Sequence, residues 1–110
     1  MKPMIRDRFR GFLPVVVDIE TGGFNAQTDA ILEIAATLVR MNDAGELVPY
    51  KTIAHNVDPF EGANLEPSAL EFTGIDPDNP LRDALPEEIA LGELFSEIRK
   101  EVRDQGCSRA

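Results

Sequence analysis

The chain has 110 residues, of which 43% are hydrophobic and 28% are charged, and this composition is typical of one small globular domain rather than a disordered tail. Its formal net charge of −9 disfavours a protein that binds nucleic acid through a uniformly basic surface. The single cysteine excludes an intrachain disulfide, and no signal peptide or membrane span is recognisable, so we expect a cytoplasmic protein without a membrane partner.

Residues 13–20 form the first predicted element. The run is rich in valine and predicts a strand, with Pro14 tolerated at its start. Because the run is so apolar, we expect this strand to be buried. Thr21, Gly22 and Gly23 then predict a loop.

Residues 30–41 form a second apolar run, which predicts a strand buried on most of both faces. Its alanine content leaves a helix open as an alternative. Residues 42–45 have the composition of a turn, and residues 47–57 predict a third strand. The two strands would then form an antiparallel hairpin.

Two helices are predicted in the second half of the chain. Residues 66–74 have Pro67 in the first turn and Gly74 just past the end. Residues 75–80 are expected to form a loop. A longer helix opens at Pro86 with an acidic first turn and ends near Gly106. Its apolar residues fall on one helical stripe, formed by Leu91, Leu94, Phe95, Ile98 and Val102.

The order of three strands followed by helices predicts an α/β fold. One long helix covers only one face of a three-stranded sheet well, so we expect further chain to follow Ala110.

The charge is unevenly distributed along the chain. Eight of the eleven Lys and Arg residues lie within residues 1–10 and 99–110. An acidic centre flanked by basic segments suits a metal-dependent enzyme that holds phosphates at its rim. Ordinary solvated surface charge remains the alternative for any one of these residues.

The strongest chemical signal is the pair Asp18 and Glu20. Residues two apart on a strand project from the same face, with Cα atoms about 6–7 Å apart. Two such carboxylates are able to hold a pair of divalent ions for in-line attack on a phosphodiester, and their oxygen atoms suit Mg²⁺ or Mn²⁺. An exposed acidic pair at a loop entrance is the alternative.

The residues that follow the pair add to this signal. Glycines at 22 and 23 allow the backbone to approach a ligand closely. Phe24 is an aromatic residue in a loop and is able to stack on a nucleobase, although core packing is an equally good explanation from the sequence.

The run Val-Asp-Ile-Glu-Thr-Gly-Gly-Phe at residues 17–24 resembles the first motif of the DEDD exonuclease superfamily. Further segments resemble the ribonuclease T family (DEDDh type) within it, namely residues 7–12, 32–36, 59–65, 72–77 and 106–110. The resemblance therefore covers nearly the whole chain.

This resemblance implies a ribonuclease H-like mixed sheet of five strands flanked by helices. The chain would contain the first three antiparallel strands and the first helices, so that residues 1–110 form the N-terminal part of a single exonuclease domain. The implied activity is 3′→5′ exoribonuclease trimming of the 3′ ends of transfer RNA and other stable RNAs. Two Mg²⁺ ions per active site are implied, with Mn²⁺ as a substitute.

The resemblance also implies roles for single residues. Asp18 would bridge both metal ions, and Glu20 would bind the ion that activates the attacking water. Phe24 and Phe72 would pack against the terminal bases of the RNA. Ser68 departs from the family pattern, which has a glutamate for base recognition at this position.

A basic patch is implied at Arg8, Arg10, Arg103 and Arg109. In the family such a patch binds nucleic acid for the active site of the partner subunit, which implies a homodimer. The family also places the strand that bears Asp18 at the centre of its sheet.

The second and third motifs of the family, which supply an aspartate, a catalytic histidine and a further aspartate, have no counterpart in this sequence. His55 matches no catalytic position and is interpreted as a structural or surface residue. We therefore expect the 110-residue chain to bind metal weakly and to be catalytically incomplete. Two alternatives remain open, a DNA-directed 3′→5′ exonuclease of the same superfamily and a non-catalytic fragment that binds nucleic acid or dimerises.

Overall fold

The computed structural model describes residues 3–110, so Lys2, one of the basic residues counted above, lies outside the described residues. The chain divides into two compact units. Unit 1 comprises Met1–Val17, Ala36–Ile53 and Glu93–Ala110, and unit 2 comprises Asp18–Ala35 and Ala54–Gly92. Assignment of residues 1–110 to a single exonuclease domain stays a prediction.

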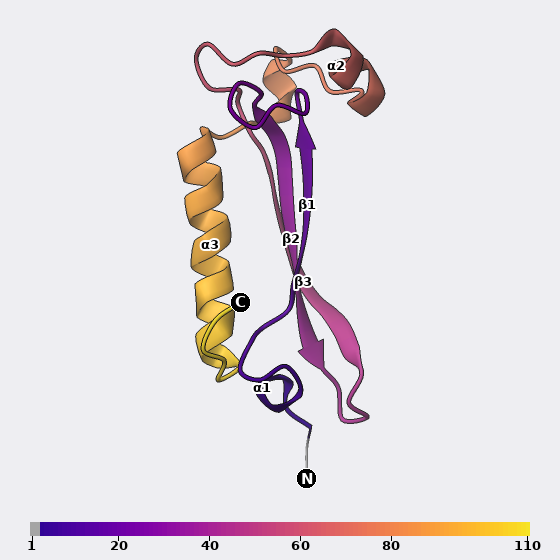
Figure 1. The fold of residues 1–110 in the computed structure, drawn as a ribbon, viewed down its shortest axis with the longest axis vertical. Coiled ribbons are helices and arrows are strands. Elements are labelled where there is room, and N and C mark those ends of the chain that lie inside the picture. The colour runs from indigo at the N-terminus through magenta and orange to yellow at the C-terminus, as the bar shows by residue number, and fades with distance from the viewer. Residues whose placement is uncertain (1–2) are drawn as a thin grey trace. The chain divides into compact units, whose positions relative to one another are not determined.

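Three strands, β1 (Val15–Thr21), β2 (Ile31–Met41) and β3 (Leu47–Asn56), pair in the order β1-β2-β3 and are antiparallel (Figure 1). Buried residues alternate with partly exposed ones along β2, which is the pattern of a strand with one face in a core. The predicted strands and the α/β class are confirmed. The helical alternative for residues 30–41 is wrong, and so is the expectation that this strand is buried on most of both faces.

The expectation that β1 is buried is wrong. Val16, Val17 and Ile19 are 61%, 49% and 44% exposed. Among the described residues β1 pairs only with β2, so it is an edge strand, and most of its residues contact solvent. High valine content predicted the strand correctly, but it carried no information on how many neighbours the strand has.

Unit 2 contains the helix α2 (Pro67–Thr73), the 3₁₀ helix η1 (Pro80–Arg82) and the first residues of α3 (Glu87–Asp104). Gly74 ends α2 in the left-handed conformation (φ 74°), and its N–H donates to the carbonyl of Leu70 at 2.9 Å. The predicted helices are confirmed, whereas η1 follows the predicted loop and was not expected. Asn79 stabilises it by accepting a hydrogen bond from the N–H of Leu81 at 3.0 Å.

Arg82 holds together the backbone of unit 2. Its Nη2 donates to the carbonyl oxygens of Leu32 and Val57 at 2.8 and 3.2 Å, and its own carbonyl accepts from Asn56 Nδ2 at 2.6 Å. Charge-assisted hydrogen bonds of this kind are stronger than neutral ones. The start of β2 and the end of β3 are therefore joined through one side chain.

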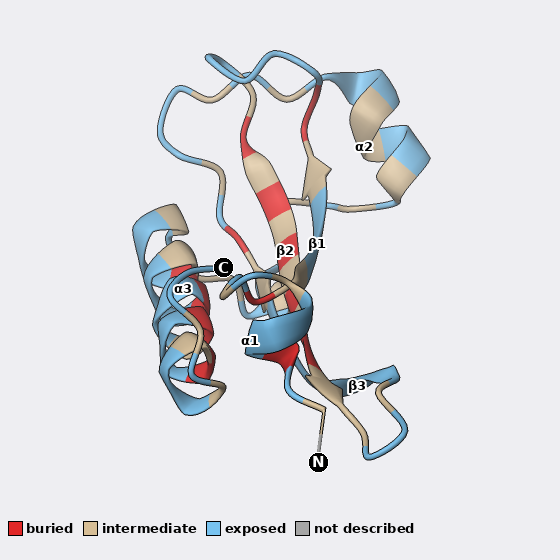
Figure 2. Ribbon diagram, turned by 60° about the horizontal axis from the view of Figure 1, so that its bottom comes forward, coloured by how far each residue is buried: buried red, intermediate tan, exposed pale blue. Residues whose placement is uncertain are grey.

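Unit 1 has a core built from segments that are distant in sequence. Ile5 from the short helix α1 (Ile5–Arg8) packs with Leu13 and Val39, and all three are buried. Leu94 and Ile98 are buried on the part of α3 that belongs to this unit (Figure 2). The sequence did not predict α1, because four residues are too few to show a helical period.

Phe95 departs from the predicted apolar stripe of α3. Its side chain is 50% exposed, whereas Leu94 and Ile98 on the same helix are 1% and 7% exposed. The buried face of α3 is thus narrower than the stripe that the sequence predicted.

The two ends of unit 1 are joined by backbone hydrogen bonds. The N–H of Leu13 donates to the carbonyl of Arg109 at 2.8 Å, and the N–H of Ser108 donates to the carbonyl of Gly11 at 2.7 Å. Gly11 has a φ of 85°, and an added Cβ would lie 3.2 Å from the Ser108 hydroxyl. The N-terminal and C-terminal segments are therefore held side by side.

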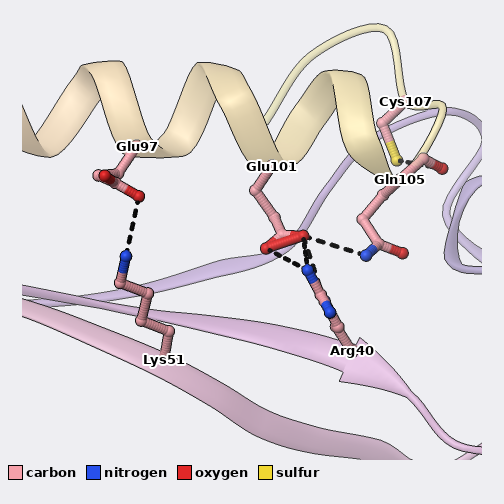
Figure 3. Close-up of polar contacts among 6 residues, drawn as sticks. All are labelled: Arg40, Lys51, Glu97, Glu101, Gln105 and Cys107. Carbon is pink, nitrogen blue, oxygen red and sulfur yellow. Dashed lines mark hydrogen bonds and ion pairs between the residues drawn. The ribbon is translucent and has the colours of Figure 1, made fainter.

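An ion pair between the half-buried Arg40 and the buried Glu101 links β2 to α3 within unit 1 (Figure 3). Arg40 donates from Nε and Nη2 to Glu101 Oε1 at 3.2 and 2.9 Å, and its guanidinium also lies 3.4 Å from the ring centroid of Tyr50. Glu101 is 3% exposed and accepts a further hydrogen bond from Gln105 at 3.1 Å. A second pair, Lys51 with Glu97 at 3.1 Å, is much more exposed.

We predict that Arg40→Met lowers the free energy of unfolding by about 3 kcal/mol, because it leaves the Glu101 carboxylate buried without its cation. Lys51→Met is the matched control, and its effect is expected to stay within about 1 kcal/mol since exposed ion pairs contribute little. Urea denaturation followed by circular dichroism measures both. Equal effects of the two substitutions would contradict the importance of the buried Glu101 carboxylate.

Candidate functional site

Asp18 and Glu20 lie on the same side of β1, as the strand alternation predicts. Both side chains line one cleft of about 300 Å³ in unit 2. The remaining walls come from β2 and β3, through the residues Glu33, Ile34, Ala35, Ala54, His55 and Asn56. The cleft is therefore formed by all three strands at the acidic end of β1.

Neither carboxylate of the pair forms a side-chain hydrogen bond or ion pair with another residue in the described range 3–110. Their oxygen atoms are the donor type that Mg²⁺ and Mn²⁺ prefer. However, no group of three or more His, Cys, Asp or Glu residues able to hold a metal ion occurs within residues 3–110. Asp18 and Glu20 are thus suitable ligands for magnesium, but these two residues alone do not form a complete ligand set.

Sequence reasoning missed that Glu33 and His55 line this cleft. His55 was interpreted as a structural or surface residue, and it lines the same cleft as Asp18 and Glu20. The pairing of β2 with β3 carries the missing signal. The N–H of Val57 donates to the carbonyl of Leu32, so His55 lies opposite Ile34 and Glu33 lies opposite Asn56.

A second pocket of about 420 Å³ adjoins the first at Glu20, which lines both. It contains Phe24 from the loop after β1. Phe72 and Ser68, both from α2, line the same pocket. The two phenyl side chains are 106% and 90% exposed. Core packing as the explanation for Phe24 is therefore wrong.

Gly22 and Gly23 allow neighbouring residues to pack closely against the loop after β1. An added Cβ at Gly22 would lie 2.6 Å from Leu65 Cδ2, and one at Gly23 would overlap the Asp29 carboxylate. The N–H of Glu66 donates to the carbonyl of Gly22 at 2.7 Å. Glycine at these positions thus serves packing within the protein, and the expected approach to a ligand stays a prediction.

The four arginines of the predicted basic patch lie in unit 1 and are exposed. Arg103 and Arg109 line an apolar groove of about 560 Å³ together with Arg99, and Arg8 and Arg10 are outside that groove. Arg109 also lies 5.4 Å from the ring centroid of Phe12. The structure brings the C-terminal members of the patch together, while the joint role of all four stays a prediction.

No helix within the described residues is long and apolar enough to cross a membrane.

A family of exonucleases, RNase_T, matches residues 15–109. Ribonuclease T of Hahella chejuensis is 62% identical over 108 residues, which are 98% of this chain and 49% of that protein. Ribonuclease T of Yersinia enterocolitica is 61% identical over 94% of this chain and 48% of that protein, and the Citrobacter koseri enzyme is 58% identical over the same shares. The chain spans about half the length of these curated relatives.

The crystal structure of a full-length 3′-exonuclease is similar in fold, with a TM-score of 0.57 and 19% sequence identity. The likeness covers 79% of this chain and 29% of the other. At this identity the comparison supports the arrangement of the strands and helices alone.

Proposed function

Since the chain belongs to the RNase_T exonuclease family, we propose that it is part of a 3′→5′ exoribonuclease that trims the 3′ ends of transfer RNA and other stable RNAs. One observation carries this proposal, namely that Glu20 lines both the carboxylate cleft and the aromatic pocket. A terminal base in the pocket would leave its phosphate beside the two carboxylates.

Asp18 and Glu20 are the metal ligands of the proposed active site. When bound, Mg²⁺ or Mn²⁺ supplies an activated water and stabilises the negative charge that develops on the phosphate. Both carboxylates lack ion-pair partners within residues 3–110, so their oxygen atoms are available to cations. Their placement on one side of β1 supports a role as a unit.

Phe24 and Phe72 bind the RNA end by stacking on its bases. Base–aromatic stacking contributes roughly 1–3 kcal/mol per base and tolerates any sequence. Ser68 lines the same pocket, and its hydroxyl is able both to donate and to accept a hydrogen bond. It therefore distinguishes bases less strictly than the carboxylate that the family has at this position.

We propose that this chain alone is catalytically incomplete, because Asp18 and Glu20 are only two carboxylate ligands. Mg²⁺ keeps its hydration waters unless several ligands converge, so binding by two carboxylates is weak. The remaining ligands and the general base belong to the second and third motifs of the family.

Arg8, Arg10, Arg103 and Arg109 are proposed to bind the phosphate backbone of RNA in the active site of a partner subunit within a homodimer. Their exposure leaves the guanidinium groups open to phosphates. The backbone pairing of residues 11–13 with 108–109 supports a joint role, because it holds the two basic ends of the chain together. We place the enzyme in the cytoplasm, where stable RNAs are processed.

The proposal predicts that the chain quenches a 3′-terminal 2-aminopurine in single-stranded RNA through stacking. Phe24→Leu and Phe72→Leu are each expected to weaken binding of this RNA by roughly 5- to 150-fold, because each removes one stacking surface. Fluorescence titration measures the affinity. Phe60→Leu is the matched control, since Phe60 is an exposed aromatic of the same unit outside the pocket.

Equal losses from all three leucine variants would contradict the aromatic pocket as the base-binding site. A DNA strand of the same sequence tests the DNA-directed alternative, which is favoured if DNA binds tighter than RNA.

The basic patch predicts a change in the salt dependence of RNA binding. For single strands each neutralised phosphate contributes about 0.7 to the slope of log K against log salt. The double variant Arg103→Ala/Arg109→Ala is therefore expected to lower the magnitude of that slope by about 1.4. Lys51→Ala is the control, because this cation is paired with Glu97. If Lys51→Ala changes the salt slope of RNA binding as much as the double variant does, the proposed role of the patch is wrong.

A further inference from the structure

The two aromatic side chains of the pocket come from separate segments of unit 2. Phe24 lies in the loop between β1 and β2, and Phe72 lies in the last turn of α2. Both rings are almost fully exposed, so packing around the rings does not fix their positions. Their spacing depends on how the loop is attached to the segment that precedes α2.

Asn64 attaches to this loop through its side chain and its backbone. Its Nδ2 donates to Asp29 Oδ1 at 3.0 Å and to Glu66 Oε1 at 2.6 Å. Its backbone N–H donates to the carbonyl of Thr28 at 2.7 Å. Asn64 therefore links the end of the loop to the residue that caps α2.

Asp29 accepts the hydrogen bonds at the other end of the same network. Its Oδ2 accepts from the N–H of Asn25, the neighbour of Phe24, at 2.9 Å. Its Oδ1 accepts from the Thr28 hydroxyl at 2.9 Å, in addition to the bond from Asn64. These hydrogen bonds lower the pKa of the Asp29 carboxyl below its usual range, with the Asn64 side chain as the largest cause and the Asn25 N–H next. The carboxylate is therefore fully ionised at neutral pH.

Glu66 completes the connection to α2. Its N–H donates to the carbonyl of Gly22 at 2.7 Å, and Glu66 is the N-cap residue of the helix that carries Phe72. An added Cβ at Gly23 would overlap Asp29 and lie 3.1 Å from Glu66 Cγ, so the three residues pack tightly. The chain of contacts runs from Asn25 through Asp29, Asn64 and Glu66 to α2.

We propose that Asp29 and Asn64 are positioning residues, which set the spacing of Phe24 and Phe72 and so allow both rings to engage one RNA end. This inference rests on the proposed function, since it assigns a purpose to the aromatic pocket. The two residues touch neither the carboxylate cleft nor the pocket itself. Their effect on RNA is therefore exerted through the attachment of the loop to α2.

The test combines a double-mutant cycle with a measurement that needs no RNA. Asp29→Ala, Asn64→Ala and the double variant are each expected to weaken binding of the 2-aminopurine RNA about tenfold, because one broken link releases the loop. Amide hydrogen exchange of Asn25, Asn64 and Glu66 is expected to accelerate at least tenfold in all three. Unchanged exchange along β2 shows that the fold is intact, and Asp29→Asn serves as a second variant of nearly equal volume.

The matched controls are Asp76→Ala and Asn79→Ala. Each removes a side chain of the same type that accepts a local backbone hydrogen bond in unit 2, away from the pocket. Neither is expected to change RNA affinity.

Faster exchange with unchanged RNA affinity would overturn the inference, because the link would then be structural only. Additive losses in the double variant would overturn it as well, since the two residues would act separately. Failure of the unmodified chain to bind the RNA would instead count against the proposed function, and the inference would fall with it.

Discussion

The period of two along β1 is the constraint on which the candidate site depends. It places Asp18 and Glu20 on one side of the strand, where both line the same cleft. A shift of either carboxylate by one position would move it to the opposite face. Because Glu20 also borders the aromatic pocket, the same alternation brings the proposed metal ligands next to the proposed base-binding surface.

The two units of the chain differ in net charge. Unit 2 has thirteen Asp and Glu residues and one cation, Arg82, whose guanidinium is engaged by backbone carbonyls. Unit 1 has ten Lys and Arg residues against seven acids. An acidic surrounding favours the binding of divalent cations near Asp18 and disfavours RNA phosphates there. The proposed function therefore needs the metal ions to offset that repulsion.

Much of the fold could be predicted from the sequence, because local periodicity determines it. The alternation of β2, the helix that starts at Pro67 and the long helix α3 all agree with the structure. Exposure was predicted less well, since it depends on which elements are neighbours. Valines in β1 predicted a buried strand, yet β1 is an edge, and Phe95 lies beyond the covered part of α3.

Residue patterning alone predicted the candidate site only within one strand, whereas Phe24 and Phe72 came from the family resemblance. The spacing of Asp18 and Glu20 predicted that both lie on one face of β1. The position of His55 in the cleft depends on the pairing of β2 with β3, which the spacing does not show. The network of Asp29 and Asn64 had no sequence signal, because 35 residues separate its partners.

Manganese-induced line broadening in the ¹H–¹⁵N spectrum of the chain tests the central claim most directly. We expect Mn²⁺ to broaden first the amides near residues 18–20, with their neighbours at 33–35 and 54–56, and the double variant Asp18→Asn/Glu20→Gln to abolish that broadening. Broadening that centres instead on the acids of another cleft, Asp58, Glu87 and Glu88, or that persists in the double variant, would contradict the account.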